Sequence, residues 1–585
     1  MSIFTRRALS VSLAIIFALS MFGATAFADW PSFQNNVNNN GVIPSDVATP
    51  PPTTTPSTIS GKLPTNGSAY VGVDTTSVIV GDIAYTLYNG GATNGTSGGA
   101  RLSALNLVNG QLVWGGTTIQ IEPKADNVQQ LSTPYYDEIY EAIYAATTYY
   151  QNHLVSDGLK GWIGPNGQIP TPYTFQSSQS PVTIVYNGLN IPSDYWEPQL
   201  VTDITASSGT ISGAVTLTNT GTGASYSFGS NTFYPGYGPW TLYNNSGTMI
   251  PKGNYRLSLT VTTNTNLSVS SLKFLLSEWS LYRVTDLGDQ PPPIEYLAGG
   301  YGQANTPIGY DYAGGNIYFG IYEGDRCYYQ YAMGYYYPPL TAYRPEGGDD
   351  FYWAGATVWE DGYVVFGGDK GRIYVRPIDS FASGAGNVIT LPDPGGKVRS
   401  SVVSWLDSSS IPYVFFTSRI SDGSGELWSI EGNLFSSAAD IDKTPVAPGL
   451  SQTSVSTPVI SDNDVLYVGA SWYDSTMYES AGGVGVLDPT DIENGGYTVY
   501  LGDPVQSSPI VWTNPNTGDD YVYFTTNTGA GKGYCYSYAP WASAGVFRWF
   551  AGGTSGNPYA LQGFAASDNG YLVYGDDDNY LYVMH

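Results

Sequence analysis

Short apolar runs, each bounded by a turn of Gly, Asn and Asp, recur along most of this 585-residue chain. The clearest are VIVGDIAYTL from Val78, ISDNDVLYVG from Ile460 and ASDNGYLVYG from Ala566, with similar pairs from Asp311 and Thr357. The runs are rich in Val, Ile and Tyr, which favour strands, and Asn-Gly or Asp-Gly turns supply the positive φ that tight hairpins require. The pattern predicts a succession of short antiparallel hairpins and few helices.

A step of small residues, often ending in proline, precedes the hairpins. Ser456-Thr457-Pro458 and Ser507-Ser508-Pro509 are two such steps, and their prolines lie 51 residues apart. Units of three or four strands repeated at about 50 residues are typical of a β-propeller. Eight units begin near Tyr70, Thr133, Thr306, Gly355, Ser400, Thr457, Ser508 and Gly563. The predicted fold is all-β, an eight-bladed propeller, with seven blades as the alternative.

Two segments carry a resemblance to a known family. Ala104–Trp114 reads ALNLVNGQLVW and Tyr538–Trp549 reads YAPWASAGVFRW, and in both a Gly-x-x-x-Trp spacing ends the run. With the opening Asp29–Phe33, DWPSF, they resemble the quinoprotein-like (PQQ-repeat) β-propellers, in which a fourth strand ends in Trp. The resemblance implies that an N-terminal strand, here around Trp30–Gln34, completes the last blade beside Leu581–Met584.

The second unit is interrupted by residues with a different pattern. The stretches DITASSGTISGAVTLTNTGTGASYSF and GNYRLSLTVTTNTNLSV alternate apolar and polar positions, which predicts half-buried antiparallel strands. We therefore expect a β-sandwich-like domain inserted in the second blade. The predicted organisation is a signal peptide at 1–28, an N-terminal strand at 29–43, a Pro/Thr-rich linker at 44–66, blades at 67–162, the insertion at 163–278 and further blades at 279–585.

The first residues have the pattern of an export signal. Arg6 and Arg7 precede an apolar run that ends in Ala26-Phe27-Ala28, which predicts cleavage after Ala28. No later stretch has the length of apolar residues that a membrane-spanning helix needs. We expect a protein secreted to the outside of the cell or held at the cell surface.

Composition narrows the function. A net charge of −27 disfavours nucleic acid and anionic membrane surfaces as partners, because these need a basic face. Two His and two Cys in the whole chain leave little for a His/Cys metal cage. Cys327 and Cys535 could pair outside the cell, but both lie in aromatic strand-like runs, where we expect them to be small buried hydrophobes.

The chemistry of the resembled enzymes is hard to place on this chain. Those enzymes use PQQ with a calcium ion on Asp, Glu and Asn ligands, and often a vicinal Cys pair. This sequence has no vicinal Cys pair, and such a calcium set cannot be placed on matching positions. We therefore predict no catalytic or cofactor-binding residues and no PQQ. Calcium remains open, with Asp576 and Asp578 as candidate ligands, although Asp and Gly there also suit a simple turn. The aromatic loop Ala332–Trp353 could present rings to sugars.

These observations favour a non-catalytic extracellular interaction or scaffold protein that binds a protein or a cell-surface glycan through blade-top loops. A PQQ- and calcium-dependent dehydrogenase and a glycan-binding or carbohydrate-active protein are the alternatives.

Overall fold

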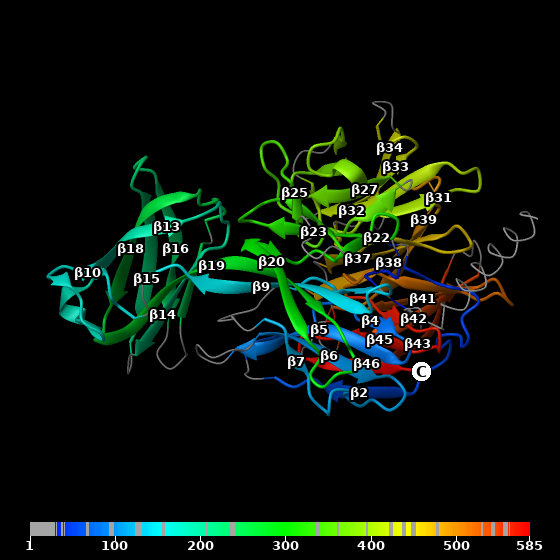
Figure 1. Ribbon diagram of the computed structural model, residues 1–585, viewed down its shortest axis with the longest axis horizontal. Helices are drawn as coiled ribbons and strands as arrows, with labels where there is room; N and C mark the ends of the chain where they lie inside the picture. The colour runs from blue at the N-terminus through cyan, green and yellow to red at the C-terminus, as the bar shows by residue number, and fades with distance from the viewer. Residues whose placement is uncertain are drawn as a thin grey trace, which may run out of the picture.

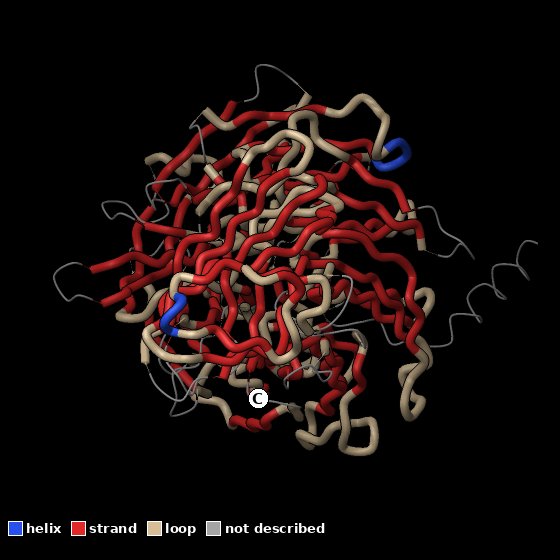
Figure 2. The backbone as a smooth tube through the Cα atoms, turned by 90° about the vertical axis from the view of Figure 1, so that its left-hand side faces the viewer, coloured by secondary structure: helices blue, strands red, loops and turns tan. Residues whose placement is uncertain are grey.

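The computed structural model describes residues 30–585 and shows strands almost throughout (Figures 1 and 2). Its description omits short stretches within that span: 31, 37–38, 40, 66–68, 93–98, 123–130, 155–157, 206–208, 234–239, 245, 334–339, 360–361, 393–395, 420–424, 436–439, 446–451, 475–478, 495, 528–530, 540–543, 554–559 and 561. The predicted signal peptide lies outside the described residues. Helix is limited there to two 3-10 turns, Ser177–Gln179 and Ile378–Ser380, and no described helix could span a membrane.

Eight four-stranded antiparallel meanders follow one another in the described part of the chain. Their innermost strands are β4 (Val78–Val80), β8 (Tyr135–Asp137), β22 (Gly309–Asp311), β26 (Thr357–Trp359), β31 (Val403–Leu406), β36 (Val459–Ile460), β40 (Ile510–Thr513) and β44 (Ala565–Ala566). The second strands are β5 (Ile83–Ala92), β9 (Ala142–Asn152), β23 (Asn316–Tyr322), β27 (Tyr363–Gly368), β32 (Pro412–Arg419), β37 (Leu466–Asp474), β41 (Asp520–Thr525) and β45 (Leu572–Gly575).

The third and fourth strands complete each meander. The third strands are β6 (Ala100–Asn106), β19 (Leu267–Val284), β24 (Tyr328–Ala332), β28 (Arg372–Pro377), β33 (Gly425–Glu431), β38 (Glu479–Leu487), β42 (Gly533–Tyr538) and β46 (Tyr580–Met584). The fourth are β7 (Ile119–Gln120), β20 (Ile294–Tyr301), β25 (Leu340–Tyr343), β29 (Asn387–Thr390), β34 (Asp440–Pro445), β39 (Gly496–Leu501), β43 (Val546–Ala551) and β2 (Thr58–Lys62). Short strands β3 (Ala69–Gly72), β21 (Gln303–Ala304), β30 (Lys397–Val398) and β35 (Gln452–Thr453) each add to a second strand.

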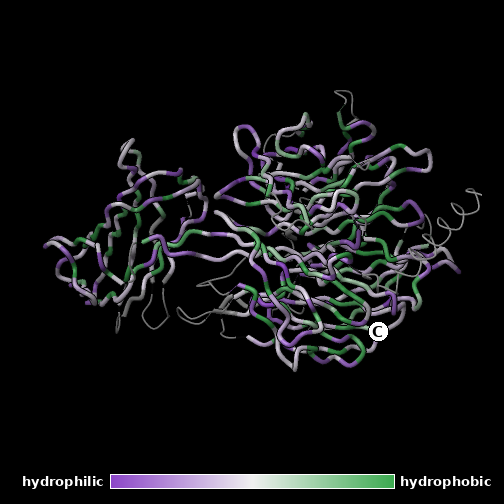
Figure 3. The backbone as a smooth tube through the Cα atoms, viewed as in Figure 1, coloured by the Kyte–Doolittle hydropathy of each residue, from purple (hydrophilic) through white to green (hydrophobic). Residues whose placement is uncertain are grey.

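The first and last meanders meet, which makes the arrangement a β-propeller. The amide N–H of Val73 donates to the carbonyl of Asp576 at 2.8 Å, and residues of both meanders share one apolar cluster. The second strands are almost wholly buried, because both of their faces pack against neighbouring meanders. Apolar residues accordingly follow the strands of the ring, as Figure 3 shows.

Residues between β9 and β19, together with the first part of β19, form a second body beside the ring (Figure 1). A six-stranded sheet has the order β11 (Gly167–Gln168), β10 (Trp162–Gly164), β13 (Val182–Ile191), β18 (Gly253–Thr263), β15 (Ile211–Asn219) and β16 (Ser225–Phe233). Strands β12 (Tyr173–Phe175) and β14 (Gln199–Thr205) pair with the outer part of β19, and β17 (Trp240–Tyr243) pairs with β14. Buried positions alternate along β15 and β18, and their apolar side chains share a core with residues of β14 and β19.

The N-terminal segment differs from its predicted place. Residues around Trp30 and Phe33 do not pair with β46; Trp30 instead pairs with Ile79 on an innermost strand, and β1 (Val42–Ile43) runs parallel to β40. Burial explains the difference. Trp30 and Phe33 are only 1% and 5% exposed, and on an outer edge their rings would be exposed to solvent, which costs hydrophobic free energy.

The strand that does close the last meander comes from the predicted linker. Strand β2, with the sequence TISGK, pairs with β46 along its whole length, and all five of its residues are exposed. A polar strand suits the solvent-facing edge of a sheet, whereas an aromatic one does not. The expectation that Trp30–Gln34 closes the ring is therefore wrong.

Candidate functional site

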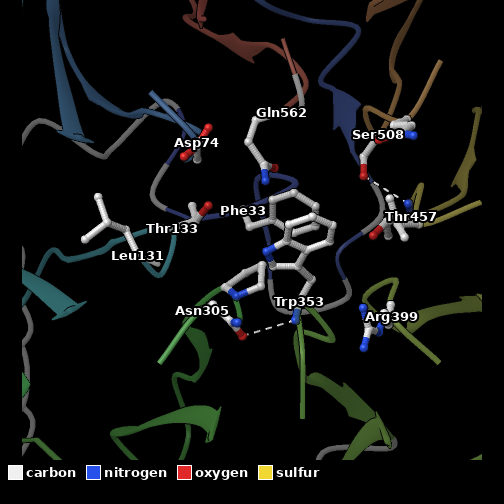
Figure 4. Close-up of a pocket in the computed structure, with 13 residues that line it drawn as sticks. Phe33, Asp74, Leu131, Thr133, Asn305, Trp353, Arg399, Thr457, Ser508 and Gln562 are labelled. Atoms are coloured by element: carbon white, nitrogen blue, oxygen red, sulfur yellow. Dashed lines mark hydrogen bonds between the residues drawn. The ribbon is translucent and has the colours of Figure 1, made fainter. Parts of the chain in front are cut away.

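One sequence position in each lead-in segment, the residues just before an innermost strand, faces the central channel. In seven meanders this residue lies four positions before the innermost strand: Asp74, Leu131, Asn305, Trp353, Arg399, Val455 and Gln506. In the last meander Gln562 lies three positions before β44. Together with Phe33, Thr133, Pro307, Thr457 and Ser508 they line one pocket, which we call the channel mouth (Figure 4).

The small residues of the lead-in segments fix the position of these side chains. Within a meander, Ser456 Oγ accepts the Gly469 amide N–H at 2.9 Å. Between meanders, the amide of Ser401 donates to Thr457 Oγ1 at 3.0 Å, and the amide of Thr457 donates to Ser508 Oγ at 2.9 Å. The steps noticed in the sequence are thus a chain of hydrogen bonds that joins neighbouring meanders around the channel.

Aromatic rings lie near the channel axis. Trp353 is half-buried, and Figure 4 shows its indole across the centre of the mouth, in front of Phe33 in that view. Its φ is +60°, a left-handed conformation in which a bulky side chain is strained, and such strain concentrates at functional positions. The Trp353 amide N–H donates to Asn305 Oδ1 at 3.3 Å, which helps to hold the residue in this conformation.

The space left at the mouth is small. Its empty volume, counted out to the open solvent, is about 470 Å³, but the part that water molecules can enter is only about 30 Å³. That core holds roughly two water molecules. The mouth therefore suits the tip of a side chain better than a whole small molecule, which needs about 300 Å³ or more.

The charged groups of the mouth lie on opposite sides (Figure 4). The Arg399 guanidinium donates to Asp369 at 3.0 and 2.7 Å and lies 4.3 Å from the centre of the Tyr352 ring, so its charge is already matched. Across the channel, burial and the nearby carboxylate of Asp577 raise the pKa of Asp74 to about 6. The Asp74 carboxylate is therefore mostly ionised at neutral pH. Asp369 is paired with Arg399, but Asp74 has no cation partner among the described residues of the mouth.

A buried carboxylate ties the second body to the ring. Glu323 is fully buried, and its Oε2 accepts the amides of Trp196 and Glu197, both at 2.9 Å. Its Oε1 accepts from Ser277 and from Gln303 Nε2. Burial is the largest cause that raises the pKa of Glu323, to about 7. The junction between the two bodies is thus built on a group that titrates near neutrality.

The candidate metal residues Asp576 and Asp578 lie in the β45–β46 turn and do not line the mouth, although Asp577 between them lies near Asp74. Asp576 Oδ1 accepts the amides of Asp578 and Tyr580 at 3.0 Å, and Oδ2 accepts the Tyr582 hydroxyl at 2.9 Å. These donors are the pattern of a turn-forming carboxylate, and they occupy oxygens that a cation would need. No three His, Cys, Asp or Glu side chains gather as metal ligands among the residues that the structure describes.

The residues present do not fit the quinone that the family resemblance implies. The water-accessible core at the mouth is about a tenth of the smallest usual cofactor pocket. Phe33 and Trp353 both line the space that a flat ring system would need, and the mouth offers a single unpaired carboxylate rather than a calcium-binding set.

The two cysteines and the aromatic loop were the other residues singled out in the sequence. Cys327 and Cys535 are both buried and form no disulfide, as expected for small hydrophobes. The loop Ala332–Trp353 is described only in part, since 334–339 lie outside the description, but its last residue is the Trp at the channel mouth.

Sequence reasoning missed the remaining residues of the mouth. The signal that could have found them is the repeat register itself, because in seven of the eight described meanders the residue four positions before the innermost strand lines the mouth. The register places Asn305, Arg399 and Gln506 at equivalent positions although their side chains share no chemistry.

Comparison with known proteins gives only distant likeness. No family model and no curated protein matches the chain. Among solved structures, BamB from Moraxella catarrhalis is 14% identical with a TM-score of 0.31, over 52% of this chain and 91% of that chain. A chain of the mitotic checkpoint complex is 12% identical with a TM-score of 0.35, over 53% of this chain and 84% of that chain. The WD40 β-propeller domain of Doa1 is 13% identical with a TM-score of 0.31, over 53% of this chain and 88% of that chain. The strand order and the contact between first and last meanders identify the chain as a β-propeller.

Proposed function

We propose that the protein is a secreted, non-catalytic propeller that serves as an extracellular or cell-surface interaction scaffold and binds a partner protein at the channel mouth. The observation that carries this proposal is the convergence of one side chain from every meander on a pocket whose water-accessible core is only about 30 Å³. Such a surface combines a fixed frame with varied side chains, which is how scaffolds present binding residues. The basic and apolar start of the sequence supports export.

The proposal extends to the architecture. Eight meanders, of the PQQ-repeat type by the Gly-x-x-x-Trp resemblance, would be the blades of one closed ring, with residues 163–278 inserted in the second. Two indole contacts support this arrangement. Trp114 Nε1 donates to the Leu287 carbonyl of the next meander at 2.8 Å, and Trp549 Nε1 donates to the Pro52 carbonyl, ahead of β2, at 2.9 Å.

Site-specific photo-crosslinking tests the proposed binding face. Benzoylphenylalanine placed at Gln562, in the mouth, is compared with the same residue at Val388, which is 43% exposed on the outer strand β29. The protein is incubated with the producing cells and irradiated. We expect a discrete crosslinked product from the mouth position and none from β29, and Trp353→Ala should weaken the product. Crosslinking from β29 alone would contradict the proposal.

A glycan partner is a second candidate, favoured by the half-buried indole of Trp353 at the end of the aromatic loop. Flat aromatic faces suit the apolar faces of sugar rings. Binding on a glycan array that disappears in Trp353→Ala would support it.

A further inference from the structure

The carboxylate of Asp74 stands out among the charges of the mouth. It is half-buried in the wall of the pocket, and its raised pKa has two causes, burial and the Asp577 carboxylate. No hydrogen-bond donor or cation contacts it among the residues that the structure describes. A carboxylate in this setting gains most from a cation that enters from outside, because the cation restores the interactions lost on burial and offsets the like charge.

The other charges around the mouth do not supply that cation. Arg399 is bound to Asp369, and Lys397 Nζ lies 3.6 Å from the same carboxylate. Asp577, whose carboxylate helps to raise the pKa of Asp74, adds a second negative charge near Asp74. The net charge of the chain, −27, has the same sign.

Two other residues that line the mouth, Trp353 and Asn305, are suited to the same ligand. The indole of Trp353, held across the mouth in its strained conformation, offers a π-face that attracts cations. Asn305 is only 2% exposed, and its Nδ2 has no hydrogen-bond partner although it lines the pocket. A buried donor of this kind is costly unless an acceptor such as a peptide carbonyl reaches it.

We propose that the channel mouth receives a lysine side chain of the partner protein, with the ammonium on Asp74, the aliphatic stem against Trp353 and a carbonyl of the partner segment on Asn305 Nδ2. The inference rests on the proposed function and names the chemistry of the partner. The narrow core favours a compact ammonium on a slender stem over the broader, planar guanidinium of arginine.

Peptide binding to the full-length mature protein tests this assignment. The probes are the peptide acetyl-Gly-Gly-Lys-Gly-Gly-amide and its norleucine counterpart, followed by saturation-transfer NMR and calorimetry at pH 8. We expect the lysine peptide to bind and the norleucine peptide to bind at least about tenfold more weakly, the size of one charge-assisted hydrogen bond. Asp74→Asn should produce the same loss, while Asp379→Asn, an exposed carboxylate elsewhere, should leave binding unchanged.

A second measurement needs no variant. Since Asp74 takes up a proton near pH 6, lysine-peptide affinity of the wild-type protein should fall between pH 8 and pH 5. Equal binding of both peptides, affinity that is unchanged by pH and by Asp74→Asn, or binding of cellobiose but not the lysine peptide would overturn the inference. Crosslinking of a partner at the mouth without lysine-peptide binding would overturn the inference and leave the proposed function standing.

Discussion

Replacing Thr457 by Val should break one link of the hydrogen-bond chain that joins the meanders around the channel. Valine has nearly the shape of threonine, so the substitution removes the hydroxyl and little else. Thr457 is 1% exposed, and its Oγ1 accepts the Ser401 amide N–H at 3.0 Å. Without that oxygen a buried N–H is left unpaired, which costs about 1–3 kcal/mol.

The same chemical change at Thr202 provides the control. Thr202, on β14 of the second body, is also 1% exposed, but its hydroxyl has no hydrogen-bond partner. Thr202→Val removes an unsatisfied buried hydroxyl, so its effect on stability should be neutral or favourable. The two substitutions are alike in volume and burial and differ only in whether the hydroxyl is used.

Amide hydrogen exchange and urea unfolding measure the difference. A loss of about 1–3 kcal/mol should speed exchange of the Ser401 amide by roughly 5- to 150-fold in Thr457→Val, with a lower free energy of unfolding. Thr202→Val should leave both unchanged or slightly improved. If the two variants lose equal stability, or if the Ser401 amide stays protected, the hydrogen-bond chain does not hold the mouth as argued.

Three further substitutions test other parts of the structure. Asn39→Ala removes the hydrogen bonds from Asn39 Nδ2 to the carbonyls of Ala356, at 2.8 Å, and Val402, at 3.1 Å. It should lower the free energy of unfolding in urea by about 1–3 kcal/mol. An unchanged value would show that these two bonds do not anchor the N-terminal segment. Asp576→Ala removes an acceptor of three hydrogen bonds and should lower the melting temperature, whereas EDTA on the wild-type protein should not, so a drop with EDTA would restore the calcium assignment. The pKa of Glu323 is about 7 in the fold and near 4.5 in the unfolded chain, so its contribution to stability is full below pH 4.5 and is lost as the pH rises to 7. The free energy of unfolding of the wild type should therefore fall relative to that of Glu323→Gln across this window. Parallel pH profiles of the two proteins would refute the buried-carboxylate argument.

Local chemistry made the hairpins predictable. The Asn569-Gly570 turn has Gly at φ +81°, and the ISDND turn places Asp464 at φ +57°, as residues tolerant of the left-handed region should. Alternation likewise indicated the strands of the second body, because one face of each is buried and the other is not. These features depend on residues close together in the sequence.

The closing strand could not be predicted in the same way. Trp30–Gln34 and Thr58–Lys62 both have strand-forming residues, and only the finished ring decides which is buried in the channel and which lies on the outer edge. The aromatic segment gains by burial and the polar one does not. A family resemblance placed the first segment on the edge, and the burial of its rings shows why that was wrong.

The mouth was beyond prediction for a related reason. Its residues are separated by about 50 positions and converge only when the ring closes, and their types vary from Asp74 to Trp353 to Gln506. The Ser and Thr steps marked where the lead-in segments lie, but the hydrogen bonds between meanders, and hence the direction of the neighbouring side chains, follow from the three-dimensional repeat.

Hydrogen exchange of the full-length protein, alone and with its crosslinked partner, tests the central claim most directly. Binding at the channel mouth should slow exchange in the lead-in segments, around Thr76, Gly355 and Ser401, and leave the outer strands β29 and β43 unchanged. Protection confined to those outer strands, or to the second body, would contradict the assignment of the mouth as the binding face.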